Sequence, residues 1–394
     1  MPAVFKIWNF GAKVMKFMHL ADLHLGKRVN EFSMLEDQKY VLKQVLDLID
    51  EERAEGLLIA GDIYDKQIPS VEAVRLFDDF LTRLADRHVP VYLIGGNHDS
   101  IERVSFGARL MSGSGIYMAT EYDGTVDVVT VKDQYGTIDI YLLPFIKPAQ
   151  VRAVWGEEAE DVRTYQEALV FVMNKLTIRG DNRSILLAHQ FVAGTAVCDS
   201  EEHAVGGLDQ VDPACFDGFD YVALGHLHGA QHAGRETVRY AGTLLKYSFS
   251  EVKHNKSVTF VELREKGQVE LYTRPIIPLH EMREIRGSYA EVTCKANYEN
   301  TDTKDYVHIT LTDEEDVFDA VGKLRVIYPN LMKLDYDNAR TRQNQSVTIS
   351  GKEDEKDPFT LADELFVLQN NKPMSDGQRE YMQGLIRKVW EEER

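Results

Sequence analysis

Residues 57–65 read Leu57-Leu-Ile-Ala-Gly-Asp-Ile-Tyr-Asp65, an apolar run that ends abruptly in a glycine and acidic residues. A short, continuous apolar run of this kind is typical of a strand that is buried on both faces of a parallel sheet. In such sheets the functional side chains gather where the strands end. The run therefore predicts a buried strand whose carboxyl end carries Asp62 and Asp65.

Four more runs of the same form lie between residues 15 and 230, namely Phe17–Asp22, Val89–Asn97, Ile185–His189 and Tyr221–His226. Helical patterns at residues 31–53 and 70–86 separate the first three strands, and Ser70 is a suitable cap for the second helix. The alternation of strands and helices predicts right-handed βαβ units and a largely parallel sheet.

Residues 116–145 and 258–273 have a different pattern, with alternating β-branched residues and glycine turns. These turns, at Asp123-Gly124, Tyr135-Gly136 and Lys266-Gly267, are typical of β-hairpins. We therefore expect two sheets packed as a sandwich and flanked by helices, rather than a simple doubly wound sheet.

The region after Pro278 predicts a separate, smaller structure. A strand at 306–311, a helix at 314–326 and a strand at 331–336 form a compact βαβ unit. A polar linker at 351–358 then precedes two apolar, helix-like segments, 359–369 and 375–391. The tail is too short to bury its apolar side chains in a core of its own, so we expect it to contact a partner helix or, alternatively, the βαβ unit.

The composition limits the classes of function. The 394 residues include 45 Lys and Arg against 64 Asp and Glu, a net charge of −19. A protein that coats nucleic acid or anionic lipid is expected to be basic, so a polyanionic substrate must be held here by a local site, by metal ions or by a partner. No Walker A motif is present, so ATP hydrolysis of that type would need another chain.

The three cysteines form no C-x-x-C pair, which argues against a disulfide framework or a cysteine zinc site and favours a reducing compartment. The sequence contains neither a convincing signal peptide nor an uncharged apolar run of about 18 residues. We therefore expect a cytoplasmic protein. Because Met15 directly precedes the first strand, residues 1–14 are interpreted as an extension without a structural role.

The polar residues at the five strand ends make up a set of metal ligands. The pairs Asp22/His24 and His226/His228 have i, i+2 spacing, which points both side chains of an extended pair to one side. With Asp62, Asn97 and His189 they make seven nitrogen and oxygen donors. That is about twice what one tetrahedral metal needs. Such a set suits two cations about 3.5–4 Å apart, which clamp a phosphoryl group and activate water. Mixed nitrogen and oxygen donors without thiolate favour Mn²⁺, Fe²⁺ or Zn²⁺ over a pure Mg²⁺ or Ca²⁺ cage.

Each motif has a structural alternative when it is taken alone. A single strand-end histidine is often part of the core, and Gly96-Asn-His-Asp99 could be a turn stabilised by its Asn and Asp side chains. In the order D-x-H, G-D-x-x-D, G-N-H-D, a lone His and G-H-x-H, however, the motifs resemble the calcineurin-like metallophosphoesterase superfamily over about residues 15–275. Within it, Ala21–Gly26, Ala60–Asp65 and Tyr240–Glu251 resemble the bacterial SbcD nucleases.

The resemblance implies an α/β fold, a four-layer β-sandwich flanked by helices, with a small α+β capping domain and a C-terminal helical segment. The expected domains are an extension at 1–14, a nuclease domain at 15–278, a capping domain at 279–350, and a linker with a helical tail at 351–394.

The resemblance also implies roles for single residues. Asp22, His24 and His228 would bind one metal, Asn97, His189 and His226 the other, and Asp62 would lie between them. His98 would lie near the scissile phosphate and protonate or stabilise the leaving 3′ oxygen. Asp99 would orient that ring, with a turn or helix cap as the alternative.

Lys27 and Arg28 are candidates for contacts with DNA phosphate, with a solvated loop as the alternative. Asp65 stands where related archaeal and eukaryotic nucleases have a histidine, so the role of that histidine is not carried over to this chain.

The resemblance implies Mn²⁺-dependent cleavage of DNA, as a double-strand exonuclease and a hairpin or single-strand endonuclease, in repair, recombination and replication. It further implies a homodimer and an SMC-like ATPase partner of the SbcC type bound through the C-terminal helices. Two alternatives remain: a phosphatase or cyclic nucleotide phosphodiesterase, and an inactive scaffold. The extension after Pro278 argues against the first, and the complete donor set argues against the second.

Overall fold

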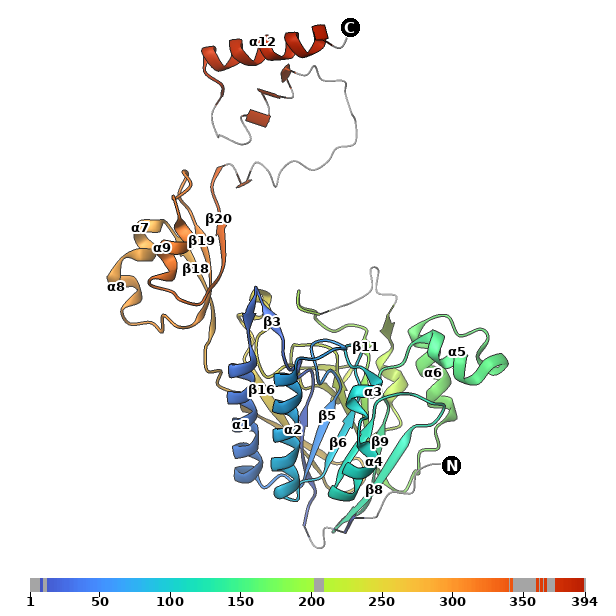
Figure 1. The fold of residues 1–394 in the computed structure, drawn as a ribbon. Helices are drawn as coiled ribbons and strands as arrows, with labels where there is room; N and C mark the ends of the chain where they lie inside the picture. The colour runs from blue at the N-terminus through green and yellow to red at the C-terminus, as the bar shows by residue number, and fades with distance from the viewer. Residues whose placement is uncertain are drawn as a thin grey trace. The chain divides into compact units, whose positions relative to one another are not determined.

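The computed structural model describes residues 8–9, 13–201, 209–339, 341–342, 359–360, 362–363, 365–366 and 373–392. The chain divides into two compact units, Met1–Glu281 and Met282–Arg394, and Figure 1 shows the elements of each. Of the segment predicted to be an extension, Trp8–Asn9 forms strand β1, which pairs with β8. This part of the segment therefore has a structural role that the sequence did not suggest.

Two sheets build the first unit. The six-stranded sheet has the order β17-β16-β2-β5-β6-β7 and consists of β2 (Lys16–Leu20), β5 (Gly56–Ala60), β6 (Val91–Ile94), β7 (Ile116–Ala119), β16 (Ser257–Leu263) and β17 (Val269–Pro275). Strands β2, β5, β6 and β7 are parallel, whereas β16 is antiparallel to both β2 and β17.

The seven-stranded sheet has the order β1-β8-β9-β10-β13-β15-β14. It consists of β1, β8 (Asp127–Asp133), β9 (Gly136–Leu142), β10 (Arg183–His189), β13 (Tyr221–Gly225), β14 (Gln231–Ala233) and β15 (Arg235–Tyr240). Strands β9, β10, β13 and β15 are parallel, so both sheets have a parallel centre.

Strand β10 contributes side chains to two separate hydrophobic clusters. Ile185 and Leu187 belong to the cluster between the two sheets, whereas Leu186 and Ala188 belong to a second cluster on the outer face. Successive side chains of a strand point to opposite faces, so a strand buried on both faces is apolar throughout.

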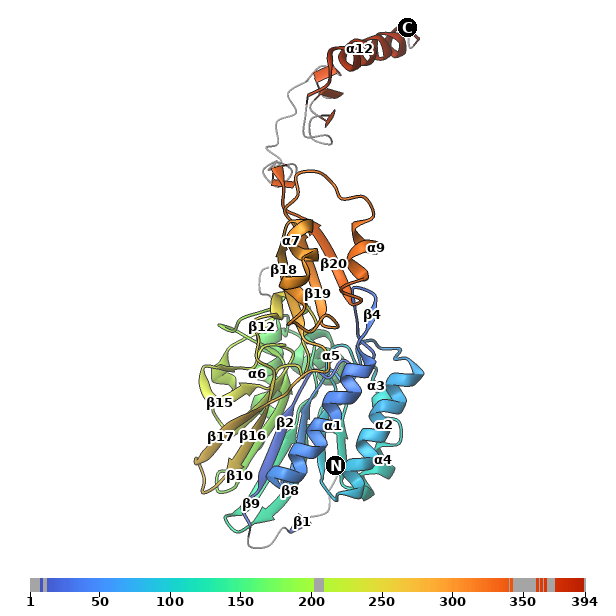
Figure 2. The same ribbon diagram turned by 90° about the vertical axis from the view of Figure 1, so that its left-hand side faces the viewer.

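Helices cover the outer faces of both sheets. The second cluster includes side chains of α5 (Pro148–Trp155) and α6 (Tyr165–Lys175), which cover the seven-stranded sheet. Helices α1 (Leu35–Glu52) and α2 (Val71–Asp86) lie beside the six-stranded sheet, with α3 (Ile101–Val104) and α4 (Ala108–Met111) nearby (Figure 2). The predicted four-layer sandwich is therefore confirmed.

Several local predictions are confirmed and others are corrected. The Ser70 side chain caps α2 by accepting a hydrogen bond from the Ala73 N–H group at 3.2 Å. The first helix begins at Leu35 rather than at residue 31, because β3 (Arg28–Val29) and β4 (Phe32–Ser33) form a hairpin. Its two turn residues, Asn30 and Glu31, both have positive φ, which a tight two-residue hairpin requires.

The turn at Asp123-Gly124 does not form a hairpin, which corrects the prediction from its sequence. It links β7 of the six-stranded sheet to β8 of the seven-stranded sheet, so the flanking strands do not pair. The predicted hairpins β8/β9 and β16/β17 are confirmed as antiparallel pairs.

The second unit contains a three-stranded parallel sheet of β18 (Met282–Gly287), β19 (Tyr306–Leu311) and β20 (Leu331–Tyr336). Its helices are α7 (Tyr289–Thr293), α8 (Lys295–Tyr298), α9 (Ala320–Arg325) and α12 (Asp376–Glu392). Strand β18 was missed because half of its residues are charged. Helix α9 is shorter than predicted because Asp319 adopts a left-handed conformation that cannot continue a helix.

Short elements complete the description: β11 (Phe191–Val192), β12 (Gln210–Val211), and 3₁₀ turns at Ser112–Ser114, Gly156–Ala159, Pro213–Phe216 and Phe249–Glu251. The helix predicted at 359–369 lies partly outside the described residues. Along the described part of the chain, no helix combines the length and the apolar character needed to cross a membrane.

Candidate active site

The seven predicted donors meet at one end of the sandwich, where strands from both sheets end. Strands β2, β5 and β6 lie in the six-stranded sheet, whereas β10 and β13 lie in the seven-stranded sheet. The His226 N–H group after β13 donates to the Asp22 carboxylate after β2 at 2.9 Å. The site is therefore built across two sheets and not along the edge of one.

The backbone at these strand ends is strained. Asp22, His24, Asp62 and His226 have φ values of 53, 43, 51 and 103°. Residues other than glycine rarely adopt positive φ, and each such residue costs of order 1–3 kcal/mol. The loops after β2 and β5 support this geometry, because the His24 N–H group donates to the Asp62 carbonyl at 3.0 Å.

Two glycines of the motifs are required by close packing. A Cβ atom on Gly96 would lie 2.0 Å from Asp62 Oδ1, and one on Gly61 would lie 2.3 Å from His189 Nδ1. Gly61 also has a φ of +88°, which favours glycine. The glycines in G-D-x-x-D and G-N-H-D therefore allow the ligand side chains to approach one another.

One part of the site, here called the His228 half, consists of His24 and His228. Their Nε2 atoms lie 3.2 Å apart, and His24 Nε2 lies 3.7 Å from Asp62 Oδ2. All three residues are buried. Two nitrogens bound to one cation at about 2.1 Å each lie about 3 to 3.5 Å apart, so this spacing fits a shared metal ion.

The other part, here called the Asn97 half, consists of Asn97, His189 and His226. Asn97 Oδ1 lies 3.0 Å from His189 Nε2 and 3.1 Å from His226 Nδ1, and His189 Nε2 lies 3.3 Å from Asp62 Oδ2. His189 Nδ1 lies 2.7 Å from the Ala60 carbonyl, which can only accept a hydrogen bond. Nδ1 therefore donates, and Nε2 is left to bind a metal.

Asp22 lies beside Asp62 and the Asn97 half. The resemblance placed it with His24 and His228, but ligand atoms of Asp22, Asp62 and His189 lie within 4.8 Å of one another. A second group with the same limit contains His24, Asp62 and His98. Asp62 belongs to both groups, as expected for a ligand shared by two cations.

Burial and charge shift the pKa values of the donors in opposite directions. Burial raises the pKa of Asp22 well above its usual value and lowers that of His24 well below it. Burial alone would raise the pKa of Asp62, but attraction to His189 outweighs it and holds that pKa low. Burial also opposes the protonation of His189, yet attraction to Asp62 and Asp22 raises its pKa to about 9. His226, buried beside His189, has its pKa lowered to about 3.

His98 lies at the more open side of the site and is half-buried, like Asn97. Its N–H group donates to Asp62 Oδ1 at 3.0 Å, and its ring packs edge-on against the His24 ring at 4.9 Å. Ring atom Nδ1 lies 3.0 Å from the Asp65 carbonyl oxygen. The group that orients this ring is thus the Asp65 carbonyl, and not Asp99 as the sequence suggested.

Asp99 has the role that was the alternative prediction. Its buried carboxylate accepts hydrogen bonds from the N–H groups of Ile63, Tyr64 and Gly96 at 3.0–3.1 Å. These bonds join the loop after β5 to the turn after β6. Burial and then repulsion from Asp62 raise the pKa of Asp99 to about 6.

The two candidate DNA contacts differ from each other. Lys27 Nζ lies 2.7 Å from Asp65 Oδ1 and 5.5 Å from the centre of the Tyr247 ring, so this cation already has partners within the site. Arg28 is exposed, and its guanidinium donates to the Glu31 carbonyl. The sequence did not anticipate the Lys27–Asp65 ion pair.

Gln38 is a supporting residue that the sequence did not single out. This buried side chain on α1 accepts from the Gly26 N–H group at 2.9 Å and donates to the His24 carbonyl at 2.8 Å. It also contacts the Tyr247 hydroxyl at 2.9 Å. A polar residue on the apolar face of a predicted helix was the available signal.

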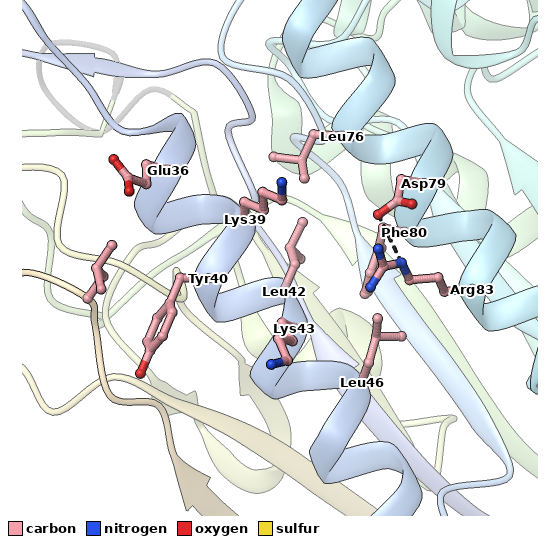
Figure 3. Close-up of a pocket in the computed structure, with 11 residues that line it drawn as sticks. Glu36, Lys39, Tyr40, Leu42, Lys43, Leu46, Leu76, Asp79, Phe80 and Arg83 are labelled. Atoms are coloured by element: carbon pink, nitrogen blue, oxygen red, sulfur yellow. Dashed lines mark ion pairs between the residues drawn. The ribbon is translucent and has the colours of Figure 1, made fainter.

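A separate groove lies between α1 and α2 and contains none of the donors (Figure 3). Its volume is about 440 Å³, and its apolar residues include Leu42, Leu46, Leu76 and Phe80. The Asp79–Arg83 ion pair lies at its edge. Chemistry at a phosphate is therefore assigned to the strand ends and not to this groove.

Comparison with known families agrees with the donor set. Residues 15–230, more than half of the chain, match the family described as calcineurin-like phosphoesterase. The chain belongs to the calcineurin-like phosphoesterase family. Its members use divalent metals, and the strand ends hold two groups of candidate ligands, His24/Asp62/His98 and Asp22/Asp62/His189. A second match, to the type 5 capsule protein repressor C-terminal domain, covers residues 278–370 of this calcineurin-like phosphoesterase.

This calcineurin-like phosphoesterase is 32% identical over 324 residues to the SbcD subunit of the SbcCD nuclease of Staphylococcus epidermidis. The match covers 81% of this chain and 85% of that protein. It identifies the chain as a homologue of this nuclease subunit and as a metal-dependent hydrolase of phosphoesters.

Solved structures show weaker similarity to this calcineurin-like phosphoesterase. The protein TT1561 of Thermus thermophilus has a TM-score of 0.39 at 14% identity, over 67% of this chain and 100% of its own. A dimetal phosphatase from Danio rerio has the same TM-score and identity, over 67% and 99%. The family assignment therefore rests on the sequence matches.

Proposed function

We propose that this chain is a manganese-dependent DNA nuclease and the catalytic subunit of a complex with an SMC-like ATPase of the SbcC type. The observation that carries the proposal is the meeting of all seven donors beside His98, in a chain that matches a nuclease subunit over most of its length. The match at residues 278–370 favours this function over a minimal phosphatase or cyclic phosphodiesterase.

The donor residues define the proposed metal site. Two divalent cations held by Asp22, His24, Asp62, Asn97, His189, His226 and His228 would supply Lewis acidity and an activated water for attack on phosphorus. Nitrogen and oxygen donors without thiolate suit Mn²⁺. Asp62 supports both halves, since its Oδ2 atom faces His24 and His189.

His98 is the proposed proton donor to the leaving 3′ oxygen. Its Nδ1 atom faces the Asp65 carbonyl, so the hydrogen on Nδ1 is engaged there. In the protonated ring Nε2 carries the transferable proton, and the half-buried side chain lies where a phosphodiester can reach it.

The experiment that tests the proposal uses the purified full chain with Mn²⁺ and end-labelled linear duplex, hairpin DNA and p-nitrophenyl phosphate. We expect hydrolysis of the DNA substrates that stops when EDTA removes the metal. Hydrolysis of the phosphomonoester without cleavage of DNA would overturn the proposal in favour of a phosphatase.

We propose that helix α12 binds the ATPase. Tyr381 and Leu385 are 71% and 41% exposed and lie four residues apart, on one helical face with Gly377 and Gly384. A face of this kind suits docking on a partner helix. Tyr381→Asp with Leu385→Asp should abolish co-purification with the ATPase, whereas Gln383→Asp on the opposite face should not.

We further propose a cytoplasmic homodimer formed through helices of the first unit. Ile68, Val71, Val74, Phe106 and Leu110 on or beside α2, α3 and α4 are 42–85% exposed. Phe106→Glu with Leu110→Glu should give a monomer in light scattering, whereas Val154→Glu on α5 should leave the oligomeric state unchanged. A dimer that persists in the double variant would contradict this assignment.

A further inference from the structure

A chain of polar side chains holds His228 from outside the donor cluster. Ser200 Oγ lies 2.7 Å from His228 Nδ1 and 2.6 Å from Glu251 Oε1. Glu251 Oε2 in turn accepts from Lys256 Nζ at 2.5 Å. Glu251 is fully buried, and His228 and Lys256 are 2% and 8% exposed. Three segments distant in sequence therefore meet behind one candidate ligand.

The directions of these hydrogen bonds determine the tautomer of His228. Glu251 Oε1 accepts from the Tyr247 N–H group at 3.2 Å, and Oε2 faces the Lys256 ammonium, so the carboxylate acts only as an acceptor. The single hydroxyl hydrogen of Ser200 must then point to Glu251. Ser200 Oγ can only accept from His228, which places the ring hydrogen on Nδ1.

This tautomer has its lone pair on Nε2, the atom that lies 3.2 Å from His24 Nε2 in the donor cluster. We propose that Ser200, Glu251 and Lys256 are positioning residues that hold His228 as the Nδ1–H tautomer, ready to bind a metal. The assignment rests on the proposed metal-dependent function and adds three residues that lie outside the predicted donor set.

The backbone of His228 is held by the same network. Its N–H group donates to Glu201 Oε1, and the other oxygen of Glu201 accepts from the Cys198 N–H group at 2.7 Å. The His228 carbonyl accepts from Lys256 Nζ at 2.9 Å, and Thr243 Oγ1 lies 2.6 Å from the same Lys256 nitrogen. The three hydrogens of the ammonium thus have three acceptors, one of which is His228 itself.

The network predicts a particular effect of Glu251→Gln. A glutamine would turn its oxygen toward the Lys256 ammonium and its NH₂ group toward Ser200. Ser200 would then accept from glutamine and donate to His228 Nδ1, which moves the ring hydrogen to Nε2, the atom that must bind the metal. Substitutions behind a metal-binding histidine typically cost about 10- to 100-fold in metal affinity.

The test uses the full chain in two measurements. Long-range ¹H–¹⁵N spectra of the metal-free protein report the tautomer of His228, assigned by comparison with His228→Gln. Titration with Mn²⁺ followed by electron paramagnetic resonance reports both binding sites. We expect Glu251→Gln to change the tautomer and to weaken one of two Mn²⁺ sites by about 10- to 100-fold.

Matched variants separate positioning from folding. Ser200→Ala should weaken the same site, whereas Ser200→Thr keeps the hydroxyl and should restore it. Asp133→Asn breaks another buried ion pair, with Arg183, and should lower stability without changing the tautomer or Mn²⁺ affinity. If Glu251→Gln does not fold, the Ser200 pair carries the test.

An unchanged tautomer and two unchanged Mn²⁺ sites in Glu251→Gln or Ser200→Ala would overturn the positioning role. The proposed function would survive that result if the wild-type chain binds two Mn²⁺ ions and cleaves DNA. A wild-type chain that binds no Mn²⁺ would instead refute the proposed function, while the tautomer of the metal-free variants would still decide the positioning role.

Discussion

The two halves of the site orient their histidines by different means. In the Asn97 half, His189 is the last residue of β10, and its Nδ1 atom meets the Ala60 carbonyl directly. The Phe145 and Phe191 rings lie 6.4 and 6.0 Å from the His226 ring. In the His228 half, His228 lies three residues beyond β13, and side chains from two other segments hold it.

The difference shows that a strand fixes the orientation of a histidine ligand through the sheet, whereas a loop does not. A residue within a strand is positioned by the sheet, so a backbone carbonyl of the same fold suffices to orient its side chain. A loop residue has more conformational freedom, and fixing it requires hydrogen bonds from other side chains. We therefore expect the His228 half to be more sensitive to substitutions outside the donor set.

The largest effect should come from Asp62, which the two halves share. Asp62→Asn removes a carboxylate charge that faces His24 and His189. We expect Mn²⁺-dependent cleavage of DNA to fall by at least about 1,000-fold, because several kcal/mol of charge stabilisation is lost. Kinetics on linear duplex DNA measure the loss, and Asp78→Asn on the exposed side of α2 is the control. If activity falls only slightly, the two halves do not depend on a shared ligand.

Replacement of His98 should affect chemistry without affecting either half. We expect His98→Ala to lower the rate of DNA cleavage by about 100- to 1,000-fold, the usual contribution of a general acid. Mn²⁺ affinity measured by titration should stay as in the wild type. Equal activity of this variant would contradict the proton-donor role, and loss of Mn²⁺ would instead make His98 a ligand.

A buried histidine outside both halves provides a baseline for the pH dependence of stability. Burial and then Arg239 lower the pKa of His19 to about 3, against about 6.5 in the unfolded chain. Between these values only the unfolded chain binds the proton, so stability is complete above pH 6.5 and falls as the pH falls toward 3. The metal-free protein should lose about 2 kcal/mol through His19 between pH 8 and 5.

Urea unfolding of the metal-free wild type and of metal-free His19→Gln, each at pH 8 and pH 5, measures this contribution. The loss of stability through His19 should be missing from the variant. His88 is exposed, so His88→Gln should keep the full pH dependence. The pH dependence of stability that remains in His19→Gln then comes from the site and from other titrating groups. An unchanged pH dependence would show that His19 is not the buried neutral group that the structure indicates.

The smallest effect should come from Phe145, which packs against the Asn97 half. Phe145→Leu removes the ring beside His226 but leaves the hydrogen bond between His189 and the Ala60 carbonyl. We expect Mn²⁺ affinity to change by less than about threefold, against the 10- to 100-fold change expected for Glu251→Gln. A larger change would mean that aromatic packing, and not the sheet, orients this half.

Much of the site could be predicted because its residues follow local patterns. Asp22, Asp62, Asn97, His189 and His226 each stand at the end of an apolar run, and the carboxyl ends of parallel strands carry functional groups. Local patterns could not decide between the two roles predicted for Asp99, nor show that Lys27 pairs with Asp65. His98 and Asp99 are neighbours in the sequence, but this does not tell which carboxylate or carbonyl faces the His98 ring.

The sequence by itself predicted most of the longer strands, a sandwich flanked by helices and the candidate donors at the strand ends, because periodicity and strand-end chemistry are local properties of a chain. The four-layer class came from the family resemblance. Only the tertiary structure showed that the donors come from two sheets, that Asp65 pairs with Lys27, and that Ser200 and Glu251 hold His228. Lys27 and Asp65 are 38 positions apart in the sequence, and Ser200 and His228 are 28 positions apart. Single polar residues that far apart leave no recognisable sequence pattern.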